Sequence, residues 1–369
     1  MKPFALPPYP YDRLIPLRKM AAAKFGEVVD MSVGAPSDAP APAVVEALST
    51  SGLERGYPPS VGIPDLRSAA SEWMSTQFGV QVGIESIGAT VGLKEFVAGI
   101  PHWLRHRNPE KDTVLYPAIS YPSYAMGAEL AHGRAVAVPL DEDGQMCLDK
   151  IESADIERAS LLWVNSPGNP NGALQDLEAV AEWGRSHGVP VISDECYIEF
   201  TWDSEPDTIV RYGTEGVLAV HSLSKRSNAA GVRAGFYAGD NELVHWISEM
   251  RKHTGMMVPG PSQHAAAVAL RDQGHVVEQR ARYERRLREM IDVLGLVGVE
   301  APMPAGGFYL WAPAPEGCWE LTERLANTLG LIVSPGDFYG EAGSGHVRVA
   351  VVQSDEAIEE LRQRAIAAQ

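Results

Sequence analysis

Length, composition and charge set the first limits on this chain. Its 369 residues are enough for about two domains. Hydrophobic residues make up 45% of the chain and charged residues 21%, which is typical of a soluble globular protein. The formal net charge of −17 argues against a general nucleic-acid binder and against a protein held on anionic membranes.

The cysteines and the N-terminal segment indicate in which cellular compartment the protein is expected. Cys147, Cys196 and Cys318 are widely spaced, which is not a zinc pattern, and an odd number is a poor disulfide framework. The first residues carry prolines and charges where a signal peptide needs an apolar run, and no apolar stretch is long enough to span a membrane. We therefore expect a cytoplasmic protein without a metal site.

The chain then divides into three regions. Residues 1–35 are rich in proline and predict an irregular arm that forms part of a small domain. Residues 36–280 alternate short apolar runs with amphipathic segments, such as Leu177–Ser186, and predict a large α/β domain with a mostly parallel central sheet. The predicted strands are Thr113–Tyr116, Leu161–Asn165, Val189–Ser193, Val217–His221 and Ala234–Ala238. The connection before the last strand is short, so one of the final two strands could return antiparallel.

Residues 281–369 predict a smaller α+β domain. A long charged amphipathic helix over residues 275–296 leads into it. Two runs typical of strands follow, Gly306–Trp311 and His346–Val352, and a helix around Glu356–Ala367 closes the chain.

Polar residues follow three successive predicted strands of the large domain. Those residues are Asn169, Asp194, Tyr197, Ser222 and Lys225. Alone, each has an ordinary interpretation as a turn former, a helix cap or a surface cation. In open α/β sheets, however, ligands bind outside the carboxyl ends of the strands, so the ordered set predicts a shared pocket.

This ordered set resembles the fold-type I pyridoxal-phosphate enzymes, and among them the class I and II aminotransferases. Residues 165–172, NSPGNPNG, resemble the family motif N-x-P-x-N-P-T-G, with Asn171 in place of the usual threonine. The family pattern continues with D-x-x-Y at 194–197, S-x-S-K at 222–225 and Arg233. The resemblance extends over nearly the whole chain.

The resemblance implies a catalytic set. Lys225 is the lysine that would hold pyridoxal 5′-phosphate covalently and act as general base. Asp194 would pair with the pyridine nitrogen and keep it protonated. Tyr197 and Asn169 would form hydrogen bonds with the phenolic oxygen of the ring.

The resemblance also implies groups that hold the phosphate and the ring. Ser222, Ser224 and Arg233 would bind the phosphate together with the backbone amides of residues 92–94, which are Gly92, Leu93 and Lys94. Tyr121 would stack on the ring. For Ser224 the alternative is a turn hydroxyl, for Tyr121 a core tyrosine, and for Lys94 a solvated cation.

Two further matches concern the partner subunit and the substrate. Tyr57 lies in a segment resembling Y-x-x-x-x-G-x-x-x-L-R, whose tyrosine reaches the phosphate of the partner subunit, which implies a homodimer with shared sites. Arg348 stands where the family keeps its carboxylate-binding arginine, and Gly34, otherwise a plain turn residue, would let backbone approach that carboxylate. Asn169 would also contact the substrate. A clamped carboxylate selects proton loss over decarboxylation, which favours transamination.

Five segments resemble the bacterial N-succinyl-LL-diaminopimelate aminotransferases: residues 116–124, 193–197, 221–231, 251–259 and 334–340. The resemblance implies transamination between N-succinyl-LL-2,6-diaminopimelate and 2-oxoglutarate in lysine biosynthesis, with no nucleic-acid or membrane partner. Arg226 and Lys252 are candidates for the distal carboxylates of this substrate, with solvated loop cations as the alternative.

Other functions remain open at this point. An aspartate, aromatic or broad-specificity aminotransferase would keep the same cofactor residues, as would a pyridoxal-phosphate-dependent C–S β-lyase. A non-catalytic regulator would be expected to carry a basic helix-turn-helix, which the sequence lacks. A dinucleotide-dependent oxidoreductase would need a strand–GxGxxG–helix fingerprint, which is also missing.

Overall fold

The computed structural model describes residues 9–369, and these divide into two compact units. The large unit comprises residues 35–282 and 304–307. The terminal unit comprises residues 9–34, 283–303 and 308–369. The boundary between residues 282 and 283 falls within helix α11 (Gly274–Leu296). Each unit has a sheet of its own.

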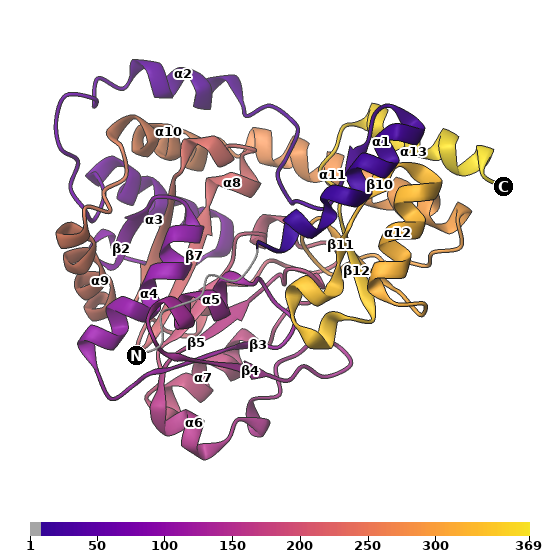
Figure 1. The fold of residues 1–369 in the computed structure, drawn as a ribbon. Helices are drawn as coiled ribbons and strands as arrows, with labels where there is room; N and C mark the ends of the chain where they lie inside the picture. Colours follow the sequence, from indigo (N-terminus) through magenta and orange to yellow (C-terminus); the bar gives the residue numbers. More distant parts are fainter. Residues whose placement is uncertain (1–8) are drawn as a thin grey trace. The chain divides into compact units, whose positions relative to one another are not determined.

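A seven-stranded sheet forms the centre of the large unit (Figure 1). In spatial order its strands are β2 (Ile87–Thr90), β8 (Gly235–Gly239), β7 (Val217–Ser222), β6 (Val191–Asp194), β5 (Ala159–Asn165), β3 (Thr113–Pro117) and β4 (Arg134–Val138). Strand β8 is antiparallel to both of its neighbours, and the other pairs are parallel. The predicted mostly parallel α/β sheet is confirmed, and the strand that returns antiparallel is the last of the five predicted.

Helices cover both faces of this sheet (Figure 1). Strand β5 is buried along its whole length, as expected of a central parallel strand. Its Leu162 and Val164 side chains join one apolar cluster, and Leu161 and Trp163 join another. The first cluster includes α2 (Pro42–Thr50), α3 (Pro64–Phe78), α7 (Leu177–His187) and α10 (Gly260–Arg271). The second includes α4 (Leu93–Arg107), α5 (Ser123–Leu130) and α9 (Asn241–Thr254).

Local signals set the limits of these helices. Asp176 caps the start of α7, where its side chain accepts a hydrogen bond of 3.0 Å from the amide of Ala179. Gly188 ends the helix with a φ of 62°, a conformation that glycine adopts without strain. Two short α-helices also belong to this unit, α6 (Ser153–Arg158) and α8 (Leu223–Arg226).

The terminal unit is a smaller α+β assembly. Its antiparallel sheet has the order β11 (Ser334–Pro335), β12 (His346–Ala350) and β9 (Tyr309–Pro313), and β1 (Val29–Asp30) pairs with β10 (Leu331–Ile332). Its helices are α1 (Ile15–Phe25), α12 (Cys318–Leu329) and α13 (Asp355–Ala367), together with the C-terminal part of α11.

The prediction of an irregular arm over residues 1–35 is wrong for α1. Pro16 lies in the first turn of this helix, where its missing N–H costs no hydrogen bond. The irregular arm predicted from Pro3, Pro7, Pro8 and Pro10 therefore does not extend through residues 15–25. Residues 1–8 lie outside the described part of the chain.

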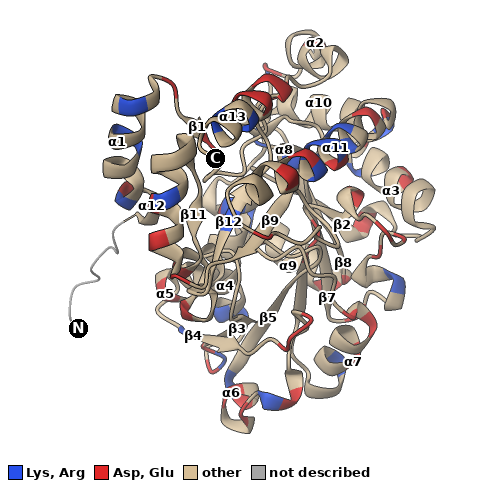
Figure 2. Ribbon diagram, turned by 90° about the vertical axis from the view of Figure 1, so that its right-hand side faces the viewer, with Lys and Arg blue, Asp and Glu red and all other residues tan. Residues whose placement is uncertain are grey.

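Charged residues lie mainly on helices (Figure 2). Basic and acidic residues one turn apart pair along α11 and α13, for example Arg288 with Glu284 and Arg362 with Glu359. Among residues 9–369 there is no helix with the length and apolar character needed to cross a membrane.

Candidate active site

The carboxyl ends of three neighbouring strands bring the predicted polar residues together within the large unit. Asn165 at the end of β5 lies in register with Asp194 at the end of β6, and Asp194 with Val220 of β7. The side-chain amide of Asn165 donates a hydrogen bond of 2.7 Å to the carbonyl oxygen of Asp194. The loops that carry Asn169, Tyr197 and Lys225 therefore leave the sheet at one edge.

The loop after β5 is tied by its own side chains. The Asn165 carboxamide oxygen accepts a hydrogen bond of 2.7 Å from the amide of Asn169. Asn171, which replaces the threonine of the family motif, accepts one of 3.2 Å from the amide of Ala173. Gly172 has a φ of 69°, and a Cβ there would lie 2.5 Å from the Cβ of Pro304. Asn171 thus closes a local turn, which is the kind of contact that asparagine favours.

Asp194 is a buried carboxylate with neutral hydrogen-bond donors. The Tyr124 hydroxyl donates to its Oδ2 at 2.9 Å, and the backbone amide of Cys196 donates to its Oδ1 at 3.3 Å. Burial raises the pKa of Asp194, and these donors and the charge of Lys225 oppose the rise. A cation beside this carboxylate would favour its ionised form.

Sequence reasoning did not assign a role to Tyr124. Its ring is fully buried and stacks on Trp163 with a centroid distance of 4.9 Å and an interplanar angle of 22°. This packing fixes the hydroxyl against Asp194. The second tyrosine of the Ser-Tyr-Pro-Ser-Tyr segment was a usable signal, because tyrosines buried beside a sheet usually direct their hydroxyl to a polar partner.

Next to Asp194 lies a second buried titratable pair, which the sequence did not reveal. The Oε2 of Glu195 is 3.5 Å from the Nε2 of His221, and both side chains are almost fully enclosed. Desolvation raises the pKa of Glu195 to about 8 and lowers the pKa of His221 to about 3. Both groups are therefore neutral near pH 7, which removes the cost of burying charge.

Lys225 belongs to the single-turn helix α8. Ser222, the last residue of β7, caps this helix: its hydroxyl accepts a hydrogen bond of 3.1 Å from the amide of Ser224 and donates one of 2.9 Å to the Ser224 hydroxyl. The Lys225 side chain is half-buried, whereas Arg226 after it is buried. A lysine at the edge of the sheet is thus placed by a capped turn.

Gly92 and Arg233 form a cradle at the start of α4. Gly92 has a φ of 68°, and a Cβ on it would lie 2.2 Å from Nη2 of Arg233. The Arg233 guanidinium donates to the carbonyl oxygen of Ala230 at 2.8 Å and to that of Val91 at 3.3 Å. Glu95 accepts a hydrogen bond of 2.7 Å from the amide of Val91, which ties the loop to the helix. A helix N-terminus beside a guanidinium suits a dianion such as phosphate.

The predicted aromatic residues differ in exposure. Tyr121 is half-buried and meets Tyr124 edge-on at 5.9 Å. Tyr197 is buried, whereas Tyr57 is 96% exposed. Of the residues whose backbone amides are predicted to bind the phosphate, Leu93 is buried and the side chain of Lys94 is exposed.

Arg348 and Gly34 belong to the terminal unit. The guanidinium carbon of Arg348 lies 4.3 Å from the ring centroid of Tyr309 and 4.7 Å from that of Tyr339. Its Nη2 donates to the carbonyl oxygen of Ser32 at 2.6 Å. Gly34 has no room for a side chain, because a Cβ there would lie 2.1 Å from the Tyr309 hydroxyl oxygen.

The structure does not support the idea that Arg226 meets a distal carboxylate of the substrate. Arg226 is 3% exposed and forms an ion pair with Glu199, so its charge is already balanced. Lys252 is exposed and pairs with Glu249 three residues earlier in α9, which matches the alternative of a solvated cation.

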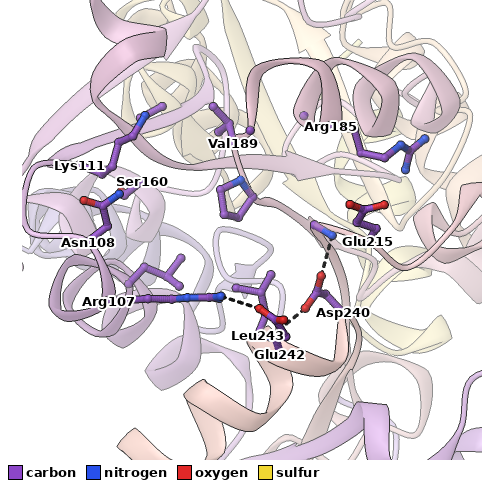
Figure 3. Close-up of a pocket in the computed structure, with 16 residues that line it drawn as sticks. Arg107, Asn108, Lys111, Ser160, Arg185, Val189, Glu215, Asp240, Glu242 and Leu243 are labelled. Carbon is purple, nitrogen blue, oxygen red and sulfur yellow. Dashed lines mark hydrogen bonds and ion pairs between the residues drawn. The ribbon is translucent and has the colours of Figure 1, made fainter.

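A cavity of about 470 Å³ opens at the opposite edge of the same sheet (Figure 3). Its lining includes Ala159, Pro190 and Gly216, which lie at or before the beginnings of β5, β6 and β7. Among its charged residues, Arg107 and Glu242 form an ion pair of 3.1 Å. The cavity therefore lies away from the strand ends that carry Asp194 and Lys225.

The residues at the carboxyl edge fit pyridoxal phosphate. A buried carboxylate lies at the end of β6, a lysine lies in the capped turn that follows β7, and the glycine–arginine cradle suits a phosphate. A doubly wound sheet with these groups at its carboxyl edge is the arrangement of fold-type I pyridoxal-phosphate enzymes.

Comparison with known families makes the assignment specific. The chain belongs to the aminotransferase class I and II family, whose model matches residues 26–364. It is therefore an aminotransferase of a family that uses pyridoxal phosphate.

Relatives with known names extend along almost the whole chain. The chain is 40% identical to the 4-dedimethylamino-4-oxo-anhydrotetracycline transaminase OxyQ of Streptomyces rimosus, over 96% of this chain and 97% of that protein. It is 32% identical to the LL-diaminopimelate aminotransferase of Aquifex aeolicus, over 97% and 96%. The structure of a probable N-succinyldiaminopimelate aminotransferase from Thermus thermophilus superposes with a TM-score of 0.87 at 26% identity, over 98% of this chain and 100% of that one.

Proposed function

We propose that this aminotransferase exchanges an amino group between N-succinyl-LL-2,6-diaminopimelate and 2-oxoglutarate, giving N-succinyl-2-amino-6-oxopimelate and glutamate. The observation that carries the proposal is an agreement between two comparisons. One relative in sequence is named as an aminotransferase of LL-diaminopimelate. One similar structure is named as a probable aminotransferase of N-succinyldiaminopimelate. The segments that resemble this group of enzymes support the same substrate.

Different residues of the large unit contact different parts of the cofactor in this proposal. Pyridoxal phosphate supplies a ring that withdraws electrons from the substrate Cα. Asp194, held by Tyr124, keeps the ring nitrogen protonated. Lys225 would hold the cofactor covalently, and once the substrate amine has displaced it, the freed Lys225 amine would move the proton at the substrate Cα. Tyr197 and Asn169 bind the phenolic oxygen.

The phosphate and the ring have their own binding groups. Ser222, Ser224, Arg233 and the amides of residues 92–94 bind the phosphate, whose charge these donors and the guanidinium match. Tyr121 packs on the ring.

Arg348 binds the α-carboxylate of the substrate, beside the backbone at Gly34. Its guanidinium is buried, and the rings of Tyr309 and Tyr339 restrict its position. If the guanidinium binds both oxygens of the α-carboxylate, it fixes the orientation of the bonds around Cα. The C–H bond is then the one that breaks.

We further propose that the enzyme is a cytoplasmic homodimer with shared sites. Tyr57 is 96% exposed in the single chain. Such exposure suits a side chain that a second copy covers and that reaches the cofactor phosphate bound by that copy. Tyr57 would supply that contact.

A second candidate function follows from the 40% identity to OxyQ, a relative named for an oxo-anhydrotetracycline. In that case the amino acceptor is a polycyclic ketone, which offers no α-carboxylate to Arg348. The alternatives of an aspartate, aromatic or broad-specificity aminotransferase keep that carboxylate contact.

The test is a panel of half-reactions with the purified holoenzyme. N-succinyl-LL-diaminopimelate is expected to be the best amino donor, ahead of LL-diaminopimelate, aspartate and aromatic amino acids. Arg348→Ala is expected to raise KM and lower kcat for these donors. A panel in which aspartate or an aromatic donor is best would overturn the substrate. Unchanged constants in the variant would mean that another group holds the carboxylate.

A further inference from the structure

A buried ion pair joins the two short segments that carry Lys225 and Tyr197. Arg226 follows Lys225 and ends α8, and Glu199 lies two residues after Tyr197. The Nε of Arg226 is 2.5 Å from Oε2 of Glu199, and its Nη2 is 3.2 Å from Oε1. Both residues are less than a tenth exposed. The contact is therefore a two-point clamp between the segments.

The same two side chains also bind groups on α3, α10 and the chain that follows α10. Arg226 Nη1 donates to the carbonyl oxygen of Ala269 at 2.7 Å. Glu199 Oε1 accepts from Nε1 of Trp73 at 3.2 Å and from Nε2 of Gln273 at 2.8 Å. The clamp is thus attached to the helical layer on one face of the sheet, where Trp73 and Ala269 belong to the same apolar cluster.

Neither segment is long enough to be stable without tertiary contacts. Helix α8 has four residues, and the turn after Tyr197 has three, Ile198–Phe200. A single helical turn is unfavourable without tertiary contacts, because it restricts several dihedral angles for very few hydrogen bonds. A buried ion pair also adds little stability relative to apolar residues of the same size. What the pair provides in this place is a fixed geometry.

We propose that Glu199 and Arg226 are positioning residues that hold Lys225 and Tyr197 at a set separation for the reaction. The inference rests on the proposed roles of Lys225 and Tyr197. If Tyr197 binds the phenolic oxygen of the cofactor, a change in this separation alters how readily the Lys225–cofactor link takes up a proton. The pair then affects the chemical step more than substrate binding.

The experiment compares Arg226→Met, Arg226→Lys, Glu199→Gln and the double variant Glu199→Leu/Arg226→Met as holoenzymes. Three quantities are measured: the pH midpoint of the visible cofactor band, the thermal midpoint of the apoprotein, and kcat and KM separately. Arg226→Met and Glu199→Gln are expected to shift the pH midpoint and to lower kcat by between about 10-fold and about 100-fold with KM little changed.

The double variant separates positioning from stability. Removing both partners avoids an unpaired buried charge, so the thermal midpoint is expected to recover relative to Arg226→Met. The shifted pH midpoint and the low kcat are expected to persist. Arg226→Lys keeps the charge but not the two-point contact, so we expect partial rescue only.

Arg286→Met in the terminal unit is the matched control. The Arg286 guanidinium is equally buried, and its Nε lies 2.6 Å from Asp355. This variant is expected to lower the thermal midpoint and leave the pH midpoint at the wild-type value.

Two outcomes would overturn the proposal, and they are distinguishable. If the Arg226 and Glu199 variants keep the wild-type pH midpoint and kcat, the pair is structural only. If borohydride fails to fix the cofactor to Lys225 in the wild-type enzyme, the assignment of Lys225 fails as well. Should Arg226→Met not fold, Arg226→Lys and Glu199→Gln decide the question with the same readouts.

Discussion

At the scale of single residues, the hydrogen bond from Tyr124 to Asp194 stabilises the carboxylate that we propose to pair with the pyridine nitrogen. The bond is 2.9 Å long and wholly buried. Tyr124→Phe removes one donor from a buried carboxylate, which is worth about 1.5–3 kcal/mol. We expect kcat to fall by at least about 10-fold, because a less stable carboxylate holds the ring nitrogen proton less well.

Steady-state kinetics and a cofactor titration test this expectation. Asp194→Ala should lower turnover far more while some cofactor still binds. A Tyr124→Phe enzyme with wild-type kcat would show that the Tyr124 hydroxyl does not support Asp194.

The Glu195–His221 pair predicts a pH dependence of stability. The folded-state pKa of Glu195 is raised from 4.5 to about 8, so the stability it contributes is present below pH 4.5 and is lost as pH rises through 8. The pKa of His221 is lowered from 6.5 to about 3, so its contribution is present above pH 6.5 and is lost as pH falls through 3. Between pH 6.5 and 8, therefore, Glu195 is the one residue of this pair whose contribution to the free energy of unfolding changes with pH.

Glu195→Gln isolates this effect, because an amide stays neutral over the whole range. In urea unfolding, the free energy of unfolding of the wild type should fall more steeply than that of the variant between pH 6.5 and 8. The difference in slope should be at most about 1.4 kcal/mol per pH unit. Parallel curves for the two proteins would contradict the raised pKa of Glu195.

At the scale of elements, the start of α4 belongs to the proposed phosphate site and has no room for a side chain at Gly92. In Gly92→Ala the new methyl group would lie 2.2 Å from Nη2 of Arg233, at a φ of 68°. We expect the dissociation constant for pyridoxal phosphate to rise at least about 10-fold, equivalent to about 1.4 kcal/mol. Titration of the apoprotein followed by absorbance measures it.

Gly188→Ala is the control for backbone strain. Gly188 has a φ of 62° at the end of α7, and a Cβ there meets nothing within 4 Å. It lines the cavity at the opposite edge of the sheet. This variant should lose stability and keep its cofactor affinity. Equal losses of affinity in both variants would mean that strain, not the phosphate cradle, is responsible.

Several elements of the fold could be predicted from the sequence because their signals are local. Strands β5 and β7 are continuous apolar runs, and α7 has both its capping aspartate and its terminal glycine. Strand β4, with the sequence Arg-Ala-Val-Ala-Val and partial exposure, has a weaker pattern and was missed. Helix α1 was missed because the prolines that precede it were taken as a sign that the whole segment is irregular.

The candidate site could be predicted only as far as its motifs reach. Asn169, Asp194 and Lys225 have fixed spacings after strands, and register alone brings their segments to one edge. Two partners of these residues come from far along the chain. Tyr124 contacts Asp194 across 70 positions of sequence, and Glu199 contacts Arg226 across 27. No local pattern encodes such distances, and for the same reason the sequence left Arg226 as either a candidate substrate contact or a solvated cation, and its buried partner Glu199 was not foreseen.

At the scale of the whole molecule, the proposed contact of Tyr57 with the phosphate of a second copy predicts a dimer. Light scattering of the holoenzyme should give twice the mass of one chain. Tyr57→Phe should leave that mass unchanged and weaken cofactor binding by about 10-fold, because one hydrogen bond to the phosphate is lost. A monomer with full activity would contradict the proposal of shared sites.

The most direct test of the central claim is the absorbance spectrum of the purified holoenzyme before and after N-succinyl-LL-diaminopimelate is added. The account predicts a visible band of cofactor bound to Lys225 that converts to the near-ultraviolet band of pyridoxamine phosphate, and that returns when 2-oxoglutarate is added. A visible band that persists with this donor but converts with another amino acid would contradict the proposed substrate. The absence of any visible band after incubation with pyridoxal phosphate would contradict the proposed role of Lys225.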